Sequence, residues 1–69
     1  MTAFVGKKEM GKRLVKLRGN KKPSVVARAI GITQSALSNY EAGIRVPRDD
    51  VKADIANYYG TTVQAIFFV

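Results

Sequence analysis

Glycine and proline divide this chain of 69 residues into short segments in which apolar residues recur at helical spacing. In the first segment Met10, Leu14 and Leu17 stand at i, i+4 and i+7, and lysines and arginines occupy the other side. No segment alternates apolar and polar residues as a half-buried strand does. The pattern therefore predicts an all-α chain.

The positions of glycine, proline and threonine predict where the helices begin and end. We predict five helices: over residues 7–18, from Pro23 to Gly31, over residues 34–42, from Pro47 to the turn at Gly60, and over residues 63–68. Thr33 is the expected N-cap of the third helix, and Gly43 is its expected C-cap. We expect one small domain over residues 7–69, preceded by an N-terminal extension over residues 1–6.

Composition limits how the chain is stabilised and what it binds. It contains no cysteine and no histidine, so we expect neither disulfides nor a bound metal, and apolar packing must hold the fold together. The formal net charge of +7 favours a polyanionic partner. No apolar run is long enough to span a bilayer and the first residues do not resemble a signal peptide, so we expect a cytoplasmic protein without membrane contact.

Catalytic signatures are missing from the sequence. There is no phosphate-binding loop, no dinucleotide fingerprint and no nucleophile beside a plausible base. We therefore expect no enzymatic activity, no cofactor and no small-molecule substrate.

The segment PSVVARAIGITQSALSNYEAG is typical of two helices joined by a tight turn. Ala27 is small enough to let the next helix approach closely, and Gly31 can adopt the left-handed conformation of a sharp turn. Leu37 is expected to fill the angle between the two helices. This spacing predicts a helix-turn-helix formed by the second and third helices.

From Leu14 to Phe68 the sequence resembles the Xre family of phage and bacterial repressors. The resemblance lies in LRG, AIGITQSALSNYE, the later Gly43, Arg45 and Pro47, and IANYYG. It implies a compact five-helix, lambda-repressor-like DNA-binding domain. It also implies a largely buried salt bridge between Arg18 of the first helix and Glu41 near the end of the third. The start of the second helix departs from the family, with Pro23 and Ser24 where relatives usually carry Gln and Glu.

The first residues of the third helix are polar, short and uncharged, as suits contact with base edges in the major groove. We expect base contacts from Gln34, Ser35, Ser38 and Asn39. The alternative is a solvated helix face with a good cap. Phosphate contacts are expected from residues on either side of this helix: Lys21, Lys22, Ser24, Arg28, Thr33, Arg45 and Arg48.

The leading interpretation is a transcriptional regulator, a repressor from a prophage or mobile element that binds a pseudo-palindromic operator in double-stranded DNA as a homodimer. Phe68 and Val69 are the expected dimer-interface residues, the alternative being that they only cover the core. Two other functions stay open. One is an antitoxin or adaptor that binds a protein partner, and the other is a controller of a restriction-modification system.

Overall fold

The computed structural model describes residues 3–69, and these residues form five α-helices. The helices are α1 (Lys7–Arg18), α2 (Pro23–Ile30), α3 (Gln34–Glu41), α4 (Asp49–Tyr59) and α5 (Val63–Phe67). The expected all-α fold with five helices is confirmed. None of these helices is long and apolar enough to cross a membrane.

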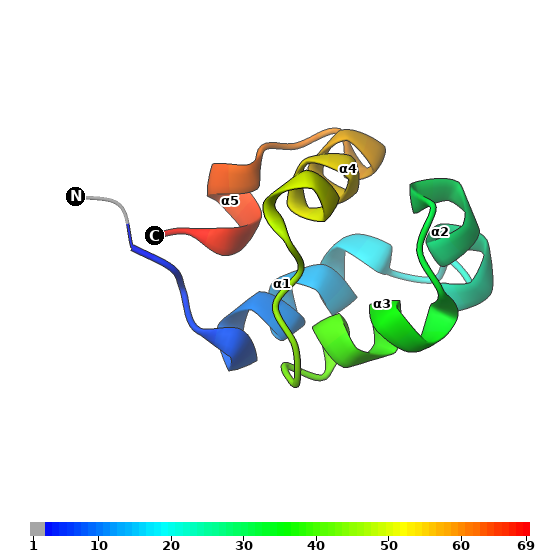
Figure 1. Ribbon diagram of the computed structural model, residues 1–69, viewed down its shortest axis with the longest axis horizontal. Helices are drawn as coiled ribbons and strands as arrows, with labels where there is room; N and C mark the ends of the chain where they lie inside the picture. The colour runs from blue at the N-terminus through cyan, green and yellow to red at the C-terminus, as the bar shows by residue number, and fades with distance from the viewer. Residues whose placement is uncertain (1–2) are drawn as a thin grey trace.

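The helices enclose one apolar core. α1 packs against α3 and α5, while α2 contacts α3 and α4. α2 lies at the end of the molecule opposite to the C-terminus (Figure 1). The fully buried side chains come from all five helices: Met10, Leu14, Val26, Leu37, Ile55, Ile66 and Phe67. The orientation of each helix is thus determined by burial of its apolar side.

Several predicted helix ends differ from the structure. α3 ends at Glu41 and α5 ends at Phe67, one residue earlier than predicted in each case. Ala42 is the C-cap of α3, and Gly43 follows it with φ +72°. The predicted C-cap at Gly43 was therefore wrong by one residue.

The prediction that Pro47 opens the fourth helix was also wrong. Pro47 is buried in the loop, and α4 begins only at Asp49. Arg48 is the N-cap and has extended backbone angles, φ −66° and ψ 164°. Proline disfavours the helical conformation for the residue before it but does not force it on the residues after it. Pro47 is instead a buried residue of the loop, two positions before α4 begins.

Leu17 is 37 % exposed, although the spacing predicted it in the buried stripe of α1. The buried residues of α1 are Met10, Gly11 and Leu14, which lie towards the middle of the helix. Leu17 instead lines the edge of the α1–α5 contact beside Ile66. Its position in the last turn of α1 leaves one side of its side chain uncovered.

Candidate nucleic-acid interface

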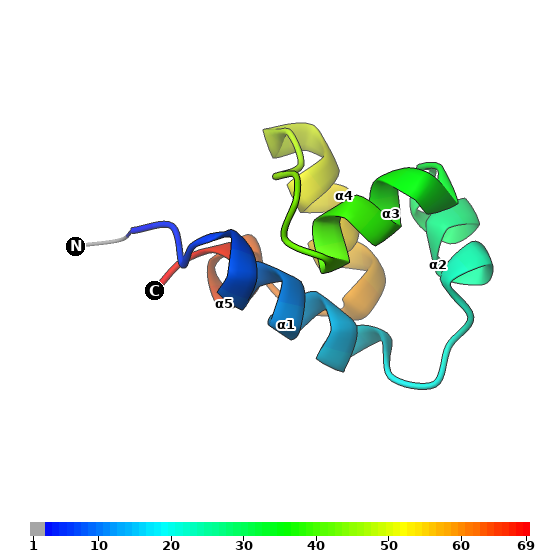
Figure 2. The ribbon, with the colours of Figure 1, turned by 90° about the horizontal axis from the view of Figure 1, so that it is seen from below.

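The turn between α2 and α3 is built on Gly31, which has φ +91° and ψ 28° in the left-handed region. Its N–H and that of Ile32 both donate to the carbonyl oxygen of Ala27, at 2.9 and 3.0 Å. These bonds satisfy the end of α2 and turn the chain sharply into α3. Figure 2 shows the two helices meeting at this turn.

Thr33 fixes the start of α3. Its Oγ1 accepts a hydrogen bond from the N–H of Ala36 at 3.0 Å, in the usual N-cap geometry. Thr33 is exposed, so the same hydroxyl lies at the surface where the helix begins. The cap therefore holds the first turn of α3 in place without burying it.

The outer side of α3 carries Gln34, Ser35 and Ser38, and all three side chains are exposed. At 100° per residue they lie within one sector of the helix, opposite to the buried Leu37 and Tyr40. Within residues 3–69 none of these three side chains takes part in a hydrogen bond. Their donors and acceptors are available to an external partner.

Asn39 lies at the margin of this sector and is half-buried. Its backbone carbonyl oxygen accepts hydrogen bonds from the N–H groups of Ile44 and Arg45, at 2.9 and 3.3 Å. The residue thus ties the loop that follows α3 to the helix itself. Arg45, whose N–H makes the second of these hydrogen bonds, has an exposed side chain.

Basic residues lie just before α2, on α2 itself and in the segment that follows α3. Lys21 and Lys22 are exposed just before α2, and the ammonium group of Lys21 lies 5.1 Å from the ring centre of Tyr58. Ser24 and Arg28 are one turn apart on the exposed side of α2, where they line a shallow hollow with Val25 and Ala29.

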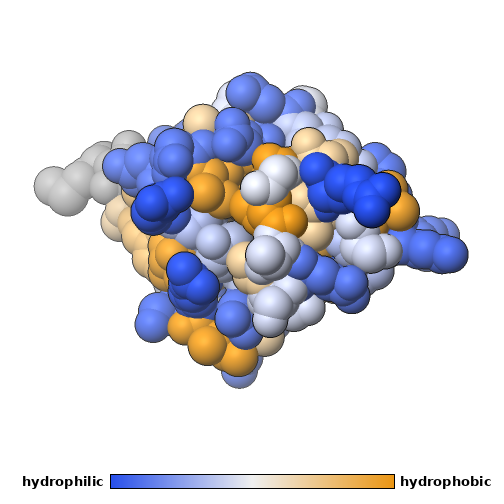
Figure 3. Space-filling view, turned by 45° about the vertical axis from the view of Figure 1, so that its right-hand side comes forward, coloured by the Kyte–Doolittle hydropathy of each residue, from blue (hydrophilic) through white to orange (hydrophobic). Residues whose placement is uncertain are grey.

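Arg48 lies after the loop and forms an ion pair with Asp50 in which the nitrogen and oxygen are 3.5 Å apart. Both side chains are mostly exposed, at 82 % and 69 %, so the pair is weak and Arg48 can exchange it for another anion. The face shown in Figure 3 mixes strongly hydrophilic side chains with separate apolar patches. Such a mixture is ordinary for the surface of a small folded domain.

An ion pair joins α1 to the end of α3. Arg18 Nε lies 2.8 Å from Glu41 Oε2, and only 19 % and 10 % of the two side chains are exposed. The hydrogen bond that Arg18 donates to the Glu41 carboxylate raises the pKa of Arg18 above its ordinary value, so the guanidinium stays charged. Arg18 Nη1 also donates to the carbonyl oxygen of Lys21 at 2.9 Å. One side chain therefore connects α1, α3 and the segment that leads into α2.

Tyr59 lies close to this ion pair. Its hydroxyl group is buried and has no hydrogen-bond partner among the described residues. Burial, with smaller contributions from the Glu41 carboxylate and Tyr58, raises the pKa of Tyr59 to about 12. The phenol is therefore held in its neutral form.

A family model described as a helix-turn-helix domain matches residues 9–66 of the chain. The chain belongs to this helix-turn-helix family. No curated protein matches the sequence, and no solved structure matches the fold. Membership of the family supports DNA binding as the activity of the domain. In this helix-turn-helix domain α2 and α3 are the two helices of the motif.

Two glycines hold the helix-turn-helix against α1. A Cβ atom on Gly11 would overlap the backbone carbonyl oxygen of Glu41, and one on Gly43 would lie 2.9 Å from the carbonyl oxygen of Lys7. Only glycine allows the backbones to approach this closely. Gly11 could not be identified from the sequence, because a glycine in the middle of a helical pattern gives no sign of which neighbour it touches.

The C-terminal residues pack partly within the helix-turn-helix domain. Phe68 is half-buried and forms an isolated antiparallel bridge with Phe4, while the N–H of Val69 donates to the carbonyl oxygen of Ala3 at 2.8 Å. Val69 itself is 74 % exposed. Of the two expected interface residues, Val69 is thus available to a partner and Phe68 is largely engaged inside the chain.

Two further side chains that sequence reasoning missed stabilise this end of the domain. Arg13 Nη1 donates to the carbonyl oxygens of Ala65 and Phe68, both at 3.0 Å, and so caps α5. The Lys52 ammonium group lies 5.4 to 5.9 Å from the ring centres of three phenylalanines: Phe4, Phe67 and Phe68. These contacts join residues far apart in sequence, and no local pattern indicates them.

Proposed function

We propose that this chain is a sequence-specific, double-stranded DNA-binding transcriptional regulator of the Xre type, in which α3 enters the major groove. It acts in the cytoplasm as a binding protein and not as an enzyme. As a repressor from a prophage or mobile element, it would block a promoter by occupying a pseudo-palindromic operator as a homodimer.

The observation that carries this proposal is the outer side of α3. Gln34, Ser35 and Ser38 are exposed, uncharged and not used in hydrogen bonds within the described chain. Glutamine can form two hydrogen bonds with adenine, and serine can donate to or accept from several base edges. A helix side that served only solubility in so basic a chain would be expected to carry charge.

The surrounding basic residues support the same mode of binding. We propose that Lys21, Lys22, Ser24 and Arg28 contact phosphates from the α2 side of the motif, with Thr33 at the start of α3. Arg45 and Arg48 contact the backbone beyond the end of α3. The ties from Asn39 to the loop and from Arg18 to Glu41 support this arrangement, since they hold Arg45 and α3 in a fixed relation.

Selection of bound sequences from a random pool of DNA duplexes tests the function directly. We expect an enriched site with two inverted halves whose centres are about 34 Å apart, one turn of the double helix. Enrichment of a single site without symmetry would argue against the dimer. A pool that stays random would contradict sequence-specific binding.

The selected site then allows a comparison of Gln34→Ala with Arg45→Ala. Loss of Gln34 should reduce affinity for the selected site by about 1 to 3 kcal/mol and relax the preference at one base pair of each half-site. Loss of Arg45 should weaken binding to all sequences alike and reduce the salt dependence by about one unit per monomer. If Gln34→Ala binds selected and scrambled duplexes as the parent does, α3 is not the reading helix.

A further inference from the structure

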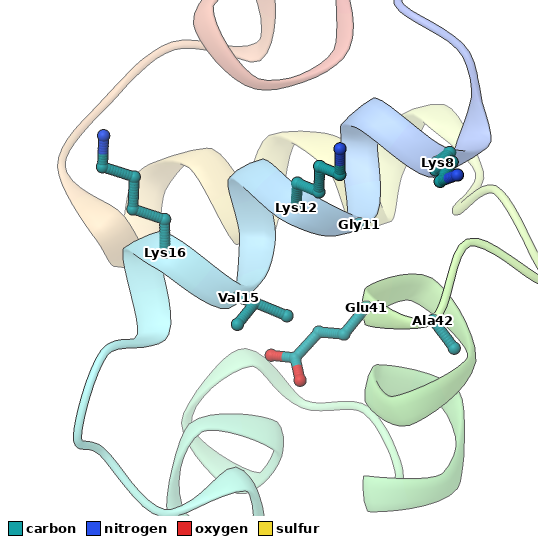
Figure 4. A pocket seen from close by; sticks show the side chains of 7 residues that line it. All are labelled: Lys8, Gly11, Lys12, Val15, Lys16, Glu41 and Ala42. Carbon is teal, nitrogen blue, oxygen red and sulfur yellow. The ribbon is translucent and has the colours of Figure 1, made fainter.

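A groove of about 440 Å³ lies between α1 and the last turn of α3, outside the proposed DNA-contacting side of the domain. Its lining residues come from α1 and from the end of α3: Lys8, Gly11, Lys12, Val15, Lys16, Glu41 and Ala42. In Figure 4 Val15 and Glu41 point into the space between the two helices, whereas Lys12 and Lys16 extend from α1 on the side away from α3. The groove thus has an apolar floor, and the lysines form a basic rim along the outer edge of α1.

The rim lysines have no acidic partner in the described part of the chain. Lys8, Lys12 and Lys16 are all exposed, and every ion pair among residues 3–69 uses another cation. They stand four residues apart, on one side of α1 and about 6 Å from one another along its axis. Like charges at this spacing repel one another. An external anion with a matching spacing would relieve that repulsion.

The floor of the groove argues for a protein partner. Val15 is 45 % exposed, and Gly11 and Ala42 continue the apolar surface across to α3. The Glu41 carboxylate adds no unpaired negative charge, because it is only 10 % exposed and bonded to Arg18. A phosphate backbone gains nothing from apolar contact of this kind, whereas an amphipathic helix gains from both the floor and the rim.

We propose that this groove binds an acidic amphipathic helix of a partner protein. Acidic side chains at four-residue intervals pair with Lys8, Lys12 and Lys16, and the apolar side of the same helix covers Val15 and Ala42. The surface is separate from Gln34 and Ser35, so a partner can dock here while α3 is on DNA. This second site goes beyond DNA binding and provides a way for another protein to be recruited by the domain.

A synthetic peptide tests the proposal without knowledge of the natural partner. The probe carries glutamates at every fourth residue beside a row of leucines, and the control peptide has the same composition in scrambled order. Both are titrated into the isotope-labelled full chain and followed by amide chemical shifts. We expect shifts from the probe confined to residues 8–16 and 41–42, and none from the control peptide.

Charge reversal on the rim supplies the matched comparison. Lys12→Glu with Lys16→Glu should weaken binding of the probe about tenfold or more, because like charges then face each other across the groove. Lys7→Glu reverses one charge on α1 outside the groove, so it is the matched control for Lys12→Glu alone, and it should alter binding less than about twofold. Val15→Ser should weaken binding without changing charge. If the double variant does not fold, Lys12→Glu alone provides the comparison.

Three results would overturn the proposal. The first is equal binding of the scrambled peptide, and the second is equal weakening by Lys7→Glu. The third comes from a titration with duplex DNA: the single variant Lys12→Glu would lose more affinity and more salt dependence than Lys7→Glu, in which case the groove takes phosphate. All three are independent of Gln34→Ala, so this proposal and the DNA-reading role of α3 fail separately.

Discussion

At the scale of the residue, Gly11 shows how one missing side chain positions the helix-turn-helix. We predict that Gly11→Ala lowers the free energy of unfolding by about 1 to 3 kcal/mol, the usual range for overpacking, because its Cβ would meet the Glu41 carbonyl oxygen. Helix propensity alone predicts the reverse, a gain of about 1 kcal/mol. Chemical denaturation decides between the two signs. Lys12→Ala, on the exposed side of the same helix, should change little.

The Arg18–Glu41 pair gives a second prediction for single residues. Because both side chains are mostly buried, Arg18→Ala and Glu41→Ala should each cost about 1.5 to 3 kcal/mol, as for other hydrogen bonds to charged groups. A double-mutant cycle should give a coupling above about 0.5 kcal/mol. Small and additive losses would mean that the two charges act independently.

Tyr59 makes stability depend on pH in the alkaline range. The pKa is about 12 in the folded chain, against an ordinary value of 10.0, so between these values the folded state keeps a proton that the unfolded state has lost. Stability is fully present below pH 10 and is lost as the pH rises towards 12. Compared with Tyr59→Phe, which cannot ionise, the parent should lose stability over this range.

Tyr59→Phe is also informative at neutral pH. The buried hydroxyl group has no hydrogen-bond partner among the described residues, so its removal should leave the free energy of unfolding equal or higher. A clear loss of stability at pH 7 would show that the hydroxyl has a partner, such as a bound water. The same pair of proteins, denatured at pH 7 and across pH 10 to 12, provides both measurements.

At the scale of the element, the sequence predicted those turns and helix ends that depend on the chemistry of one or two neighbouring residues. The α2–α3 turn could be predicted because glycine at position 31 permits the left-handed backbone of the turn and Thr33 has a hydroxyl that can cap α3. The start of α4 was misplaced because Pro47 permits a helix start without requiring one. The contacts of Arg13 with Ala65 and Phe68 span more than 50 residues, so no local pattern could reveal them.

In the candidate site, too, some features could be predicted from the sequence and others could not. The exposure of Gln34, Ser35 and Ser38 follows from helical periodicity, so their place on one side of α3 could be read from the sequence. The half-burial of Asn39 could not be foreseen, since it depends on the path of the loop back to its carbonyl oxygen.

The turn itself provides a prediction for the α2–α3 element. A Cβ at Gly31 would have nothing within 4 Å, so any cost of substitution arises only from its φ of +91°. Gly31→Val should therefore lower stability by about 1 to 3 kcal/mol. Gly31→Asn should cost less, because asparagine tolerates the left-handed region. Equal melting temperatures for the two variants would mean that backbone strain does not control this turn.

At the scale of the whole molecule, the chain measures 35 × 21 × 21 Å, and its C-terminus lies at one end of the long axis (Figure 1). α3 lies nearer to the other end, beside α2 (Figure 1). Two copies whose α3 helices are about 34 Å apart, one turn of DNA, can therefore bring their C-terminal ends together only if their long axes are inclined to one another.

Its exposure gives Val69 the leading role in the proposed dimer. Val69 is 74 % exposed at that end, whereas Phe68 is bonded through its carbonyl oxygen to Arg13 and paired with Phe4. Deleting both residues would also damage the fold, so Val69→Asp is the cleaner change. We predict that it reduces cooperative binding to a duplex with two half-sites by about fivefold or more. Binding to a duplex with one half-site should stay unchanged, because α3 and the surrounding basic residues are not altered. The measurement is a titration of each duplex with the parent and with Val69→Asp. If the cooperativity is undiminished, the dimer contact lies elsewhere. The next residue to test is then Ile44, which is 66 % exposed beside Arg45.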